Sequence, residues 1–227
     1  MLDGPGGALE LMLYEPDDAA PEDGRPCLLV LDGDRFFGAA AAGVAALSRR
    51  SEKTGVASMA VAAVTRRSGG AMEDRRARDF TRYPCAEPDV SREGGGGAGF
   101  LDRLVDEVLP CILETAAIDS RRLTLFGHSL AGLFVLETLE AAPDLFARWI
   151  SISPSLWWRT PDPAIGGPAL MVGCGEAETR RNMRGSIEHW ATSTPGRQAR
   201  FHLAPGADHG SAPFALLPDA LRHASVG

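Results

Sequence analysis

Residues 123–136, "LTLFGHSLAGLFVL", constrain the fold more than any other stretch of this chain. An apolar run ends at Phe126, a Gly-His-Ser triplet follows, and a helix-like run of small and apolar residues comes next. A strand that ends at Gly-x-Ser and continues as a helix makes a tight turn, which projects the serine from the carboxyl edge of a sheet. The stretch therefore predicts an α/β fold with Ser129 as a candidate nucleophile.

Two features of this stretch leave the interpretation open. Serine is a common helix N-cap, so Ser129 could equally be a residue that caps the following helix. Ala131 also stands where the pattern G-x-S-x-G has its second glycine. Because alanine adds a single methyl group, we expect the turn to keep its geometry.

Alternating strand-like and helix-like segments extend this pattern along the chain. Six short apolar runs bounded by turn residues predict buried strands, and the segments between them have helical character. The expected strands are residues 26–33, 55–64, 121–127, 148–155, 169–175 and 199–204, and the expected helices are residues 38–50, 100–116 (kinked at Pro110), 130–143 and 211–224. This order predicts a mostly parallel central sheet with helices on both faces. A glycine run within residues 91–100 predicts a flexible surface loop.

Composition narrows the class of protein. The 227 residues are 44% hydrophobic and 23% charged, which predicts one soluble domain over residues 1–227. A net charge of −7 argues against nucleic-acid binding through a basic field. We expect no membrane span and a cytoplasmic protein, because no apolar run approaches ~20 residues and the first residues lack a basic n-region. The four cysteines form no C-x-x-C pair, so we expect free thiols, no metal and no cofactor.

A serine nucleophile requires a histidine and an acid, and these follow the serine in α/β-hydrolases. His209, in the loop "APGADHGSAPF", is the candidate base, because the loop lies between the last expected strand and the last expected helix. Glu176 or Glu178, just after the strand 169–175, could orient its imidazole. Asp208 adjoins the histidine and would normally point away from it. A Ser–His dyad without an acid also remains open.

Two further groups are candidate substrate contacts. Six arginines against three acids give the segment 66–82 a local excess of three positive charges, which fits either a solvated loop or an anion site. The arginines are Arg66, Arg67, Arg75, Arg76, Arg78 and Arg82. Trp157 and Trp158 either pack under a helix or line a pocket in which an indole stacks on a flat ring.

Several motifs, in the same order, resemble the esterase branch of the α/β-hydrolases that includes the ferric-siderophore esterases of the Fes and IroE type. The resemblance covers residues 27–214. The motifs that carry it are "LLVLDGDRFF", "RRARDFTRYP", "GGGGAGFLDRLVDEVLPCI", "FGHSLAGLFVLETLEAAPDLFARWISISPSLWW" and the final Asp-His-Gly. The resemblance implies the α/β-hydrolase fold.

The resemblance also implies roles for residues. Ser129 would attack an ester carbonyl while His209 acts as base and then as acid. The backbone N–H groups of Asp34 and Leu130 would form the oxyanion hole, although residues 32–34 could equally be a plain turn that ends a strand.

The resemblance places the Arg-x-Arg-Asp segment near the site, which makes Arg78 a candidate substrate contact. Trp157, Trp158 and His128 are the other residues expected to contact substrate. A ferric triscatecholate siderophore is a trianion, and bidentate arginines suit its oxygens.

The sequence thus predicts a serine esterase that acts through an acyl-enzyme on a small-molecule ester. The favoured substrate is a siderophore ester, possibly as its anionic iron complex, hydrolysed inside the cell. The alternatives are a general carboxylesterase, a thioester hydrolase of the S-formylglutathione type, or a hydrolase-fold binding protein without catalysis. Two departures from the family put the substrate in doubt: Ala131, and the ten-residue link 159–168, where the family usually carries a longer helical insertion.

Overall fold

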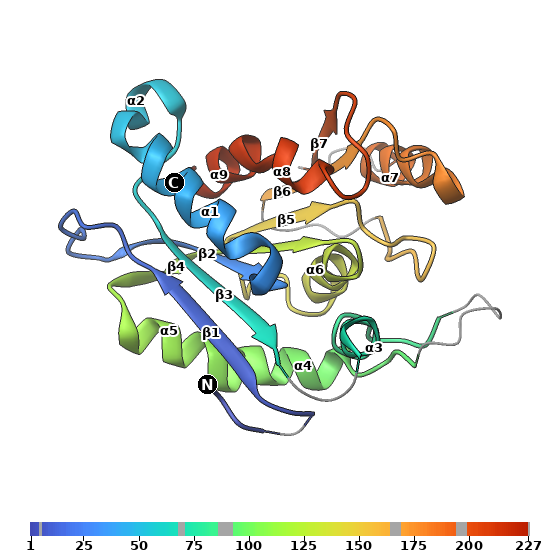
Figure 1. Cartoon of the computed structure of the whole chain (residues 1–227), viewed down its shortest axis with the longest axis horizontal. Helices are drawn as coiled ribbons and strands as arrows, with labels where there is room; N and C mark the ends of the chain where they lie inside the picture. The colour runs from blue at the N-terminus through green and yellow to red at the C-terminus, as the bar shows by residue number, and fades with distance from the viewer. Residues whose placement is uncertain (5, 68–70, 86–92, 164–168, 194–198, 227) are drawn as a thin grey trace.

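The structure is a computed structural model that describes residues 1–4, 6–67, 71–85, 93–163, 169–193 and 199–226 (Figure 1). Seven strands form one sheet in the order β1-β3-β2-β4-β5-β6-β7. They are β1 (Leu9–Tyr14), β2 (Arg25–Leu31), β3 (Ala60–Arg66), β4 (Ile118–His128), β5 (Arg148–Ile152), β6 (Ala169–Gly175) and β7 (Ala199–Ala204). Each neighbouring pair is parallel except β1 and β3, which are antiparallel. The mostly parallel sheet confirms the predicted α/β fold class.

Helices cover both faces of the sheet (Figure 1). They are α1 (Gly33–Leu47), α2 (Ser51–Thr54), α3 (Met72–Asp79), α4 (Gly97–Arg103), α5 (Leu109–Thr115), α6 (Leu130–Ala141), α7 (Met183–Thr192), α8 (Ala212–Ala215) and α9 (Leu217–Ser225). Short 3₁₀ turns lie at Ser48–Arg50 and Arg180–Asn182, and a π-helical turn at Leu104–Val108 joins α4 to α5. No helix in the described ranges is both long and apolar enough to cross a membrane.

The core divides between the two faces of the sheet because successive strand residues point to opposite sides. Leu28 and Val30 of β2 pack with residues of α1 and α9, whereas Leu29 and Leu31 pack with residues of α4, α5 and α6. Every residue of β2 is buried. Burial on both faces explains why the central strands are continuous apolar runs without alternation.

The six expected strands correspond to β2–β7, and the expectation for residues 199–204 coincides with β7. The strand expected at residues 55–64 begins later, at Ala60, because Gly55 takes a left-handed conformation (φ 71°) that ends α2. Two elements were not predicted from the sequence: β1, which is an antiparallel edge strand, and α3 within the basic segment. All four cysteines are free thiols, as expected, and Cys27 and Cys174 are buried.

The glycine run needs a correction. Residues 91 and 92 lie outside the described residues, but Gly94 to Gly97 pack closely against the segment after α3. The N–H groups of Gly95 and Gly97 donate to the carbonyl of Thr81, at 3.1 and 2.8 Å. A Cβ on Gly94 would lie 2.4 Å from the Thr81 hydroxyl oxygen and 2.5 Å from the Trp158 ring. These glycines therefore permit close packing and do not form a flexible loop.

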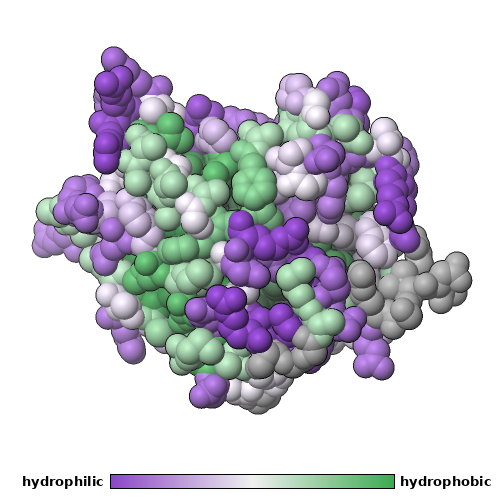
Figure 2. Space-filling view, viewed as in Figure 1, coloured by the Kyte–Doolittle hydropathy of each residue, from purple (hydrophilic) through white to green (hydrophobic). Residues whose placement is uncertain are grey.

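Much of the charge of the basic segment is paired within the protein. Arg66 and Arg78 pair with Asp79, and Arg67 pairs with Glu10. Figure 2 shows hydrophilic side chains gathered over the start of α1 and the end of β3 on one face of the molecule. The ion pairs with Asp79 and Glu10 engage three of the six arginines in residues 66–82.

Candidate active site

Three side chains meet at the carboxyl edge of the sheet. Ser129 follows β4, Glu178 follows β6 and His209 follows β7. The Oγ of Ser129 lies 3.1 Å from Nε2 of His209, and Nδ1 of His209 lies 2.8 Å from Oε2 of Glu178. Because the strands are parallel, their carboxyl ends share one edge, which brings together residues 80 positions apart.

The turn at Ser129 has an unusual backbone. Its φ of 63° and ψ of −119° fall in a region that non-glycine residues rarely adopt. The Ser129 N–H donates to the carbonyl of Ile152 at 3.0 Å, and the Ser129 carbonyl accepts hydrogen bonds from the N–H groups of Leu133 and Ser155. Such a conformation persists only where surrounding contacts hold it, as these three backbone hydrogen bonds do.

The residues flanking Ser129 fit this tight turn. A Cβ on Gly127 would lie 2.2 Å from the carbonyl oxygen of Ala131, so glycine is required there. The methyl group of Ala131 is fully buried in the core and is accommodated. Ser129 occupies the N-cap position of α6, but its side chain makes no capping hydrogen bond. Its hydroxyl is hydrogen bonded to His209, which does not fit the simple cap interpretation.

Glu178 is a buried carboxylate with three hydrogen-bond donors. Oε2 faces His209, while Oε1 accepts from the Ser153 hydroxyl and from the Gly175 N–H, each at 2.6 Å. Burial alone would raise the pKa of Glu178, but the hydrogen bonds from His209, Ser153 and Gly175 outweigh it and lower the pKa. The group is therefore ionised at neutral pH and can orient the imidazole and stabilise its protonated form.

The other candidate acids make different contacts. The carboxylate of Glu176 is exposed and accepts the N–H of Gly206 at 2.9 Å. The carboxylate of Asp208 accepts the N–H and hydroxyl of Ser211, at 2.8 and 2.6 Å. Of the two glutamates that the sequence left open, the geometry therefore favours Glu178, and it also disfavours a Ser–His dyad.

His128, expected as a substrate contact, is not among the residues that line the cleft described below. This side chain is only 2% exposed, and Nε2 lies 2.9 Å from the backbone carbonyl of His209. Because a carbonyl oxygen can only accept, Nε2 must carry the hydrogen. Burial, together with the neighbouring His209, lowers the pKa of His128 to about 3, so the ring is neutral. Its contacts point to support of the His209 loop and not to substrate binding.

A cleft of about 560 Å³ opens over Ser129 and His209. Leu130 lines it, and its N–H is at the first position of α6, where helical N–H groups lack an intrahelical acceptor. The other lining residues are Glu73, Arg76, Ser155, Trp157, Ala177, Glu178, Thr179, Arg180, Arg181, Met183, Asp208 and Gly210. Three arginines thus face the cleft, together with the three carboxylates of Glu73, Glu178 and Asp208.

Arg76 connects the floor of this cleft to a smaller cavity that Asp34 lines. Its guanidinium pairs with the buried carboxylate of Asp32 at 2.9 Å and reaches the carbonyl of His128 at 3.4 Å. The carboxylate of Asp34 accepts the hydroxyl of Thr65 at 3.0 Å. Of the two expected oxyanion donors, Leu130 lines the cleft beside Ser129, and Asp34 lines the smaller cavity.

Two of the expected substrate contacts lie elsewhere. Arg78 bonds to Asp79 and to the carbonyl of Gly6, and it lines a different cavity. Residues two positions apart on a helix point about 200° apart, so Arg76 of α3 faces the cleft and Arg78 does not. Trp158 is fully buried, and its Nε1 donates to the carbonyl of Tyr83 at 3.0 Å. Trp157 does line the cleft.

Sequence reasoning missed three groups at the site. It did not single out Arg180 and Arg181, although they follow Glu178 closely, and it preferred Arg78 to Arg76 because α3 was not recognised. Ser153, which supports Glu178, lies within the run "SISPS" after β5. Within the described residues, no group of three His, Cys, Asp or Glu side chains could hold a metal ion.

A family model described as "Putative esterase" matches residues 4–208. The chain belongs to this Esterase family. Ferri-bacillibactin esterase BesA of Bacillus subtilis is 35% identical over 159 residues, which cover 66% of this chain and 55% of that protein. Apo-salmochelin esterase of Escherichia coli is 33% identical over 149 residues, which cover 62% of this chain and 45% of that protein. The matches span about half the length of these curated relatives.

Solved structures share the fold. The crystal structure of the BES protein from Bacillus cereus is similar to this chain with a TM-score of 0.86 and 26% identity. The similarity covers 98% of this chain and 91% of that one. The fold and the family expected from the sequence motifs are therefore confirmed.

The Esterase family member described here should depend on Glu178 and not on Glu176. Glu178→Gln keeps the shape of the side chain but removes the charge that stabilises a protonated His209, so kcat on an ester should fall by roughly 10³–10⁴-fold. Glu176→Gln is the matched control and should retain kcat within about twofold, because its exposed carboxylate bonds away from His209. Equal losses in the two variants would contradict the assignment of the acid.

His128 offers a second matched pair. His128→Met removes the donor to the His209 carbonyl, whereas His128→Gln keeps an N–H close to the position of Nε2. An unsatisfied buried carbonyl costs about 1–3 kcal/mol, so kcat should fall about ten- to hundredfold in the Met variant and recover in the Gln variant. Steady-state kinetics and circular dichroism would separate this effect from unfolding. If Gln is no better than Met, the hydrogen bond does not support the site.

Proposed function

We propose that this protein is a serine esterase that cleaves carboxylic esters through an acyl-enzyme intermediate. The observation that carries the proposal is the chain of hydrogen bonds from Ser129 through His209 to Glu178. Membership of the Esterase family supports it. The strained backbone at Ser129 supports it as well, because strain of this kind is common where a nucleophile is presented.

The geometry supports the following reaction sequence. Nε2 of His209 accepts the proton of the Ser129 hydroxyl as Oγ attacks the ester carbonyl. The tetrahedral intermediate then collapses, His209 transfers the proton to the leaving alkoxide, and the acyl group stays on Ser129. A water molecule, deprotonated by His209, then attacks this acyl group. The second tetrahedral intermediate collapses with cleavage of the bond to Oγ, the carboxylic acid product leaves, and His209 returns the proton to Ser129. Glu178 balances the positive charge on His209 in both halves of the reaction.

The negative oxygen of the intermediate needs hydrogen-bond donors. The N–H of Leu130, at the start of α6 and on the cleft, is well placed for this role, and the N-terminal end of a helix favours a negative charge. The N–H of Asp34 as a second donor stays a prediction. Arg76 adds a positive charge to the cleft floor, although its pairing with Asp32 compensates most of it.

We further propose that the substrate is a siderophore ester. The relatives named as ferri-bacillibactin and apo-salmochelin esterases support this substrate class. Arg180 and Arg181 support it too, because both line the cleft with exposed side chains that would attract an anionic ligand. A carboxylesterase that acts on neutral esters needs no such charge. A site of action inside the cell remains a prediction.

A charge-neutralising variant tests the substrate class. We expect the wild type to hydrolyse a trilactone catecholate siderophore, with or without bound iron, with a higher kcat/KM than p-nitrophenyl acetate. Arg180→Gln should lower kcat/KM for the siderophore about three- to fivefold and leave the neutral ester within about twofold, because an exposed charge contributes up to about 1 kcal/mol. Arg78→Gln, which removes an arginine outside the cleft, is the matched control. Equal or better activity on the simple ester would favour the general esterase.

A further inference from the structure

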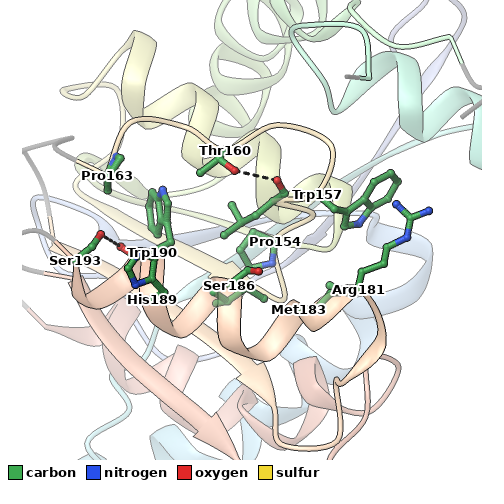
Figure 3. Close-up of a pocket in the computed structure, with 12 residues that line it drawn as sticks. Pro154, Trp157, Thr160, Pro163, Arg181, Met183, Ser186, His189, Trp190 and Ser193 are labelled. Carbon is green, nitrogen blue, oxygen red and sulfur yellow. Dashed lines mark hydrogen bonds between the residues drawn. The ribbon is translucent and has the colours of Figure 1, made fainter. Parts of the chain in front are cut away.

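A second cavity of about 380 Å³ lies beside the catalytic cleft, between α7 and the segment that follows β5 (Figure 3). Its lining is mainly apolar and contains two tryptophans, a methionine and two prolines. The residues are Pro154, Leu156, Trp157, Thr160, Pro163, Arg181, Met183, Ser186, Ile187, His189, Trp190 and Ser193. None of these residues is acidic.

The walls of this cavity are fixed by packing and hydrogen bonds. Trp190 is 3% exposed, and its Nε1 donates to the carbonyl of Pro161 at 2.8 Å. Two of the hydroxyl groups on the lining are used by backbone carbonyls. Thr160 donates to Leu156 at 3.1 Å and Ser193 to Trp190 at 3.2 Å, as the dashed lines in Figure 3 show. With these hydrogens directed to backbone oxygens, the cavity presents mostly carbon to a ligand.

The cavity adjoins the catalytic cleft at one end. Trp157, Arg181 and Met183 line both spaces. Of the two residues just before Trp157, Ser155 lines the cleft and Leu156 lines the cavity. The guanidinium carbon of Arg181 lies 4.2 Å from the centre of the Trp157 ring. In Figure 3 this pair stands at the end of the cavity opposite Trp190.

The backbone is strained at the same boundary. Arg181 and Asn182 have φ values of 54° and 51°, in the left-handed region, although neither is glycine. Asparagine adopts this region more readily than other non-glycine residues, but for Arg181 it is costly, and such conformations cluster at ligand-binding segments. Here the strained pair leads into α7 and holds Arg181 over Trp157, where both face the cleft and the cavity.

We propose that this cavity binds an aromatic group carried by the ester substrate while the ester carbonyl lies at Ser129. The inference rests on the proposed esterase function. The volume accommodates one ring and its connecting atoms, and tryptophan and methionine side chains make favourable contacts with aromatic rings. Arg181 at the boundary suits a ring that carries hydroxyl or anionic oxygens. The absence of acids from the described lining disfavours a cationic group.

Simple alkyl esters allow a direct test, since their hydrolysis can be followed by titration of the released acid. Ethyl 3-phenylpropanoate and 2-phenylethyl acetate carry a ring on the acyl and the alcohol side, and ethyl acetate carries none. In the wild type, kcat/KM for at least one aromatic ester should exceed that for ethyl acetate. Ser186→Phe places a ring inside the cavity, away from the catalytic cleft, and should lower this ratio at least tenfold.

Thr192→Phe is the matched control, because it adds the same ring at an exposed position of α7 outside the cavity and should leave the ratio unchanged. If Ser186→Phe does not fold, Ser186→Leu fills part of the same space. An unaltered ratio in the Ser186 variants, or an equal fall in Thr192→Phe, would overturn the aromatic site. If the wild type hydrolyses none of these esters, the proposed esterase function is itself wrong. Failure of the aromatic site and failure of the esterase function therefore give different results.

Discussion

The buried carboxylate of Glu178 is the group on which the arrangement of the site depends. Its hydrogen bonds reach the segment after β5 through Ser153, the end of β6 through Gly175 and the loop after β7 through His209. One ionised side chain thereby fixes three adjacent connections at the carboxyl edge of the sheet. Because it is only 4% exposed, these donors must compensate for the water that it loses on burial. The imidazole of His209 is consequently oriented before substrate binds.

A second buried ionic contact supports the other side of the site. Asp32 at the end of β2 pairs with Arg76 of α3, and Arg76 reaches the carbonyl of His128 next to Ser129. His128 in turn bonds the backbone of His209. His128 therefore links the turn at Ser129 to the loop that carries His209, independently of the contact between Ser129 and His209. Hydrogen bonds and ion pairs of buried polar side chains thus fix the positions of Ser129 and His209, which lie in connections after strands and not within them.

The sequence predicted those parts of the structure that follow from local pattern. Apolar runs located six strands, and the tight-turn motif and the loop position singled out Ser129 and His209. The sequence could not choose between Glu176 and Glu178, because both follow β6 and their directions depend on the turn they lie in. It missed Arg76 and placed Trp158 at the site because neither the phase of α3 nor the packing of neighbouring tryptophans is encoded in spacing alone. The strand β1 escaped notice because a short edge strand has a weak signal.

The most direct test of the central claim is the site of covalent modification by a fluorophosphonate, which reacts with activated serines. Peptide mass spectrometry of the modified protein should place a single adduct on Ser129, with loss of ester hydrolysis in proportion to labelling. Ser129→Ala should neither be labelled nor hydrolyse esters, while its fold, followed by circular dichroism, should be intact. An adduct on another serine, or wild-type hydrolysis by Ser129→Ala, would contradict the assignment of Ser129 as the nucleophile.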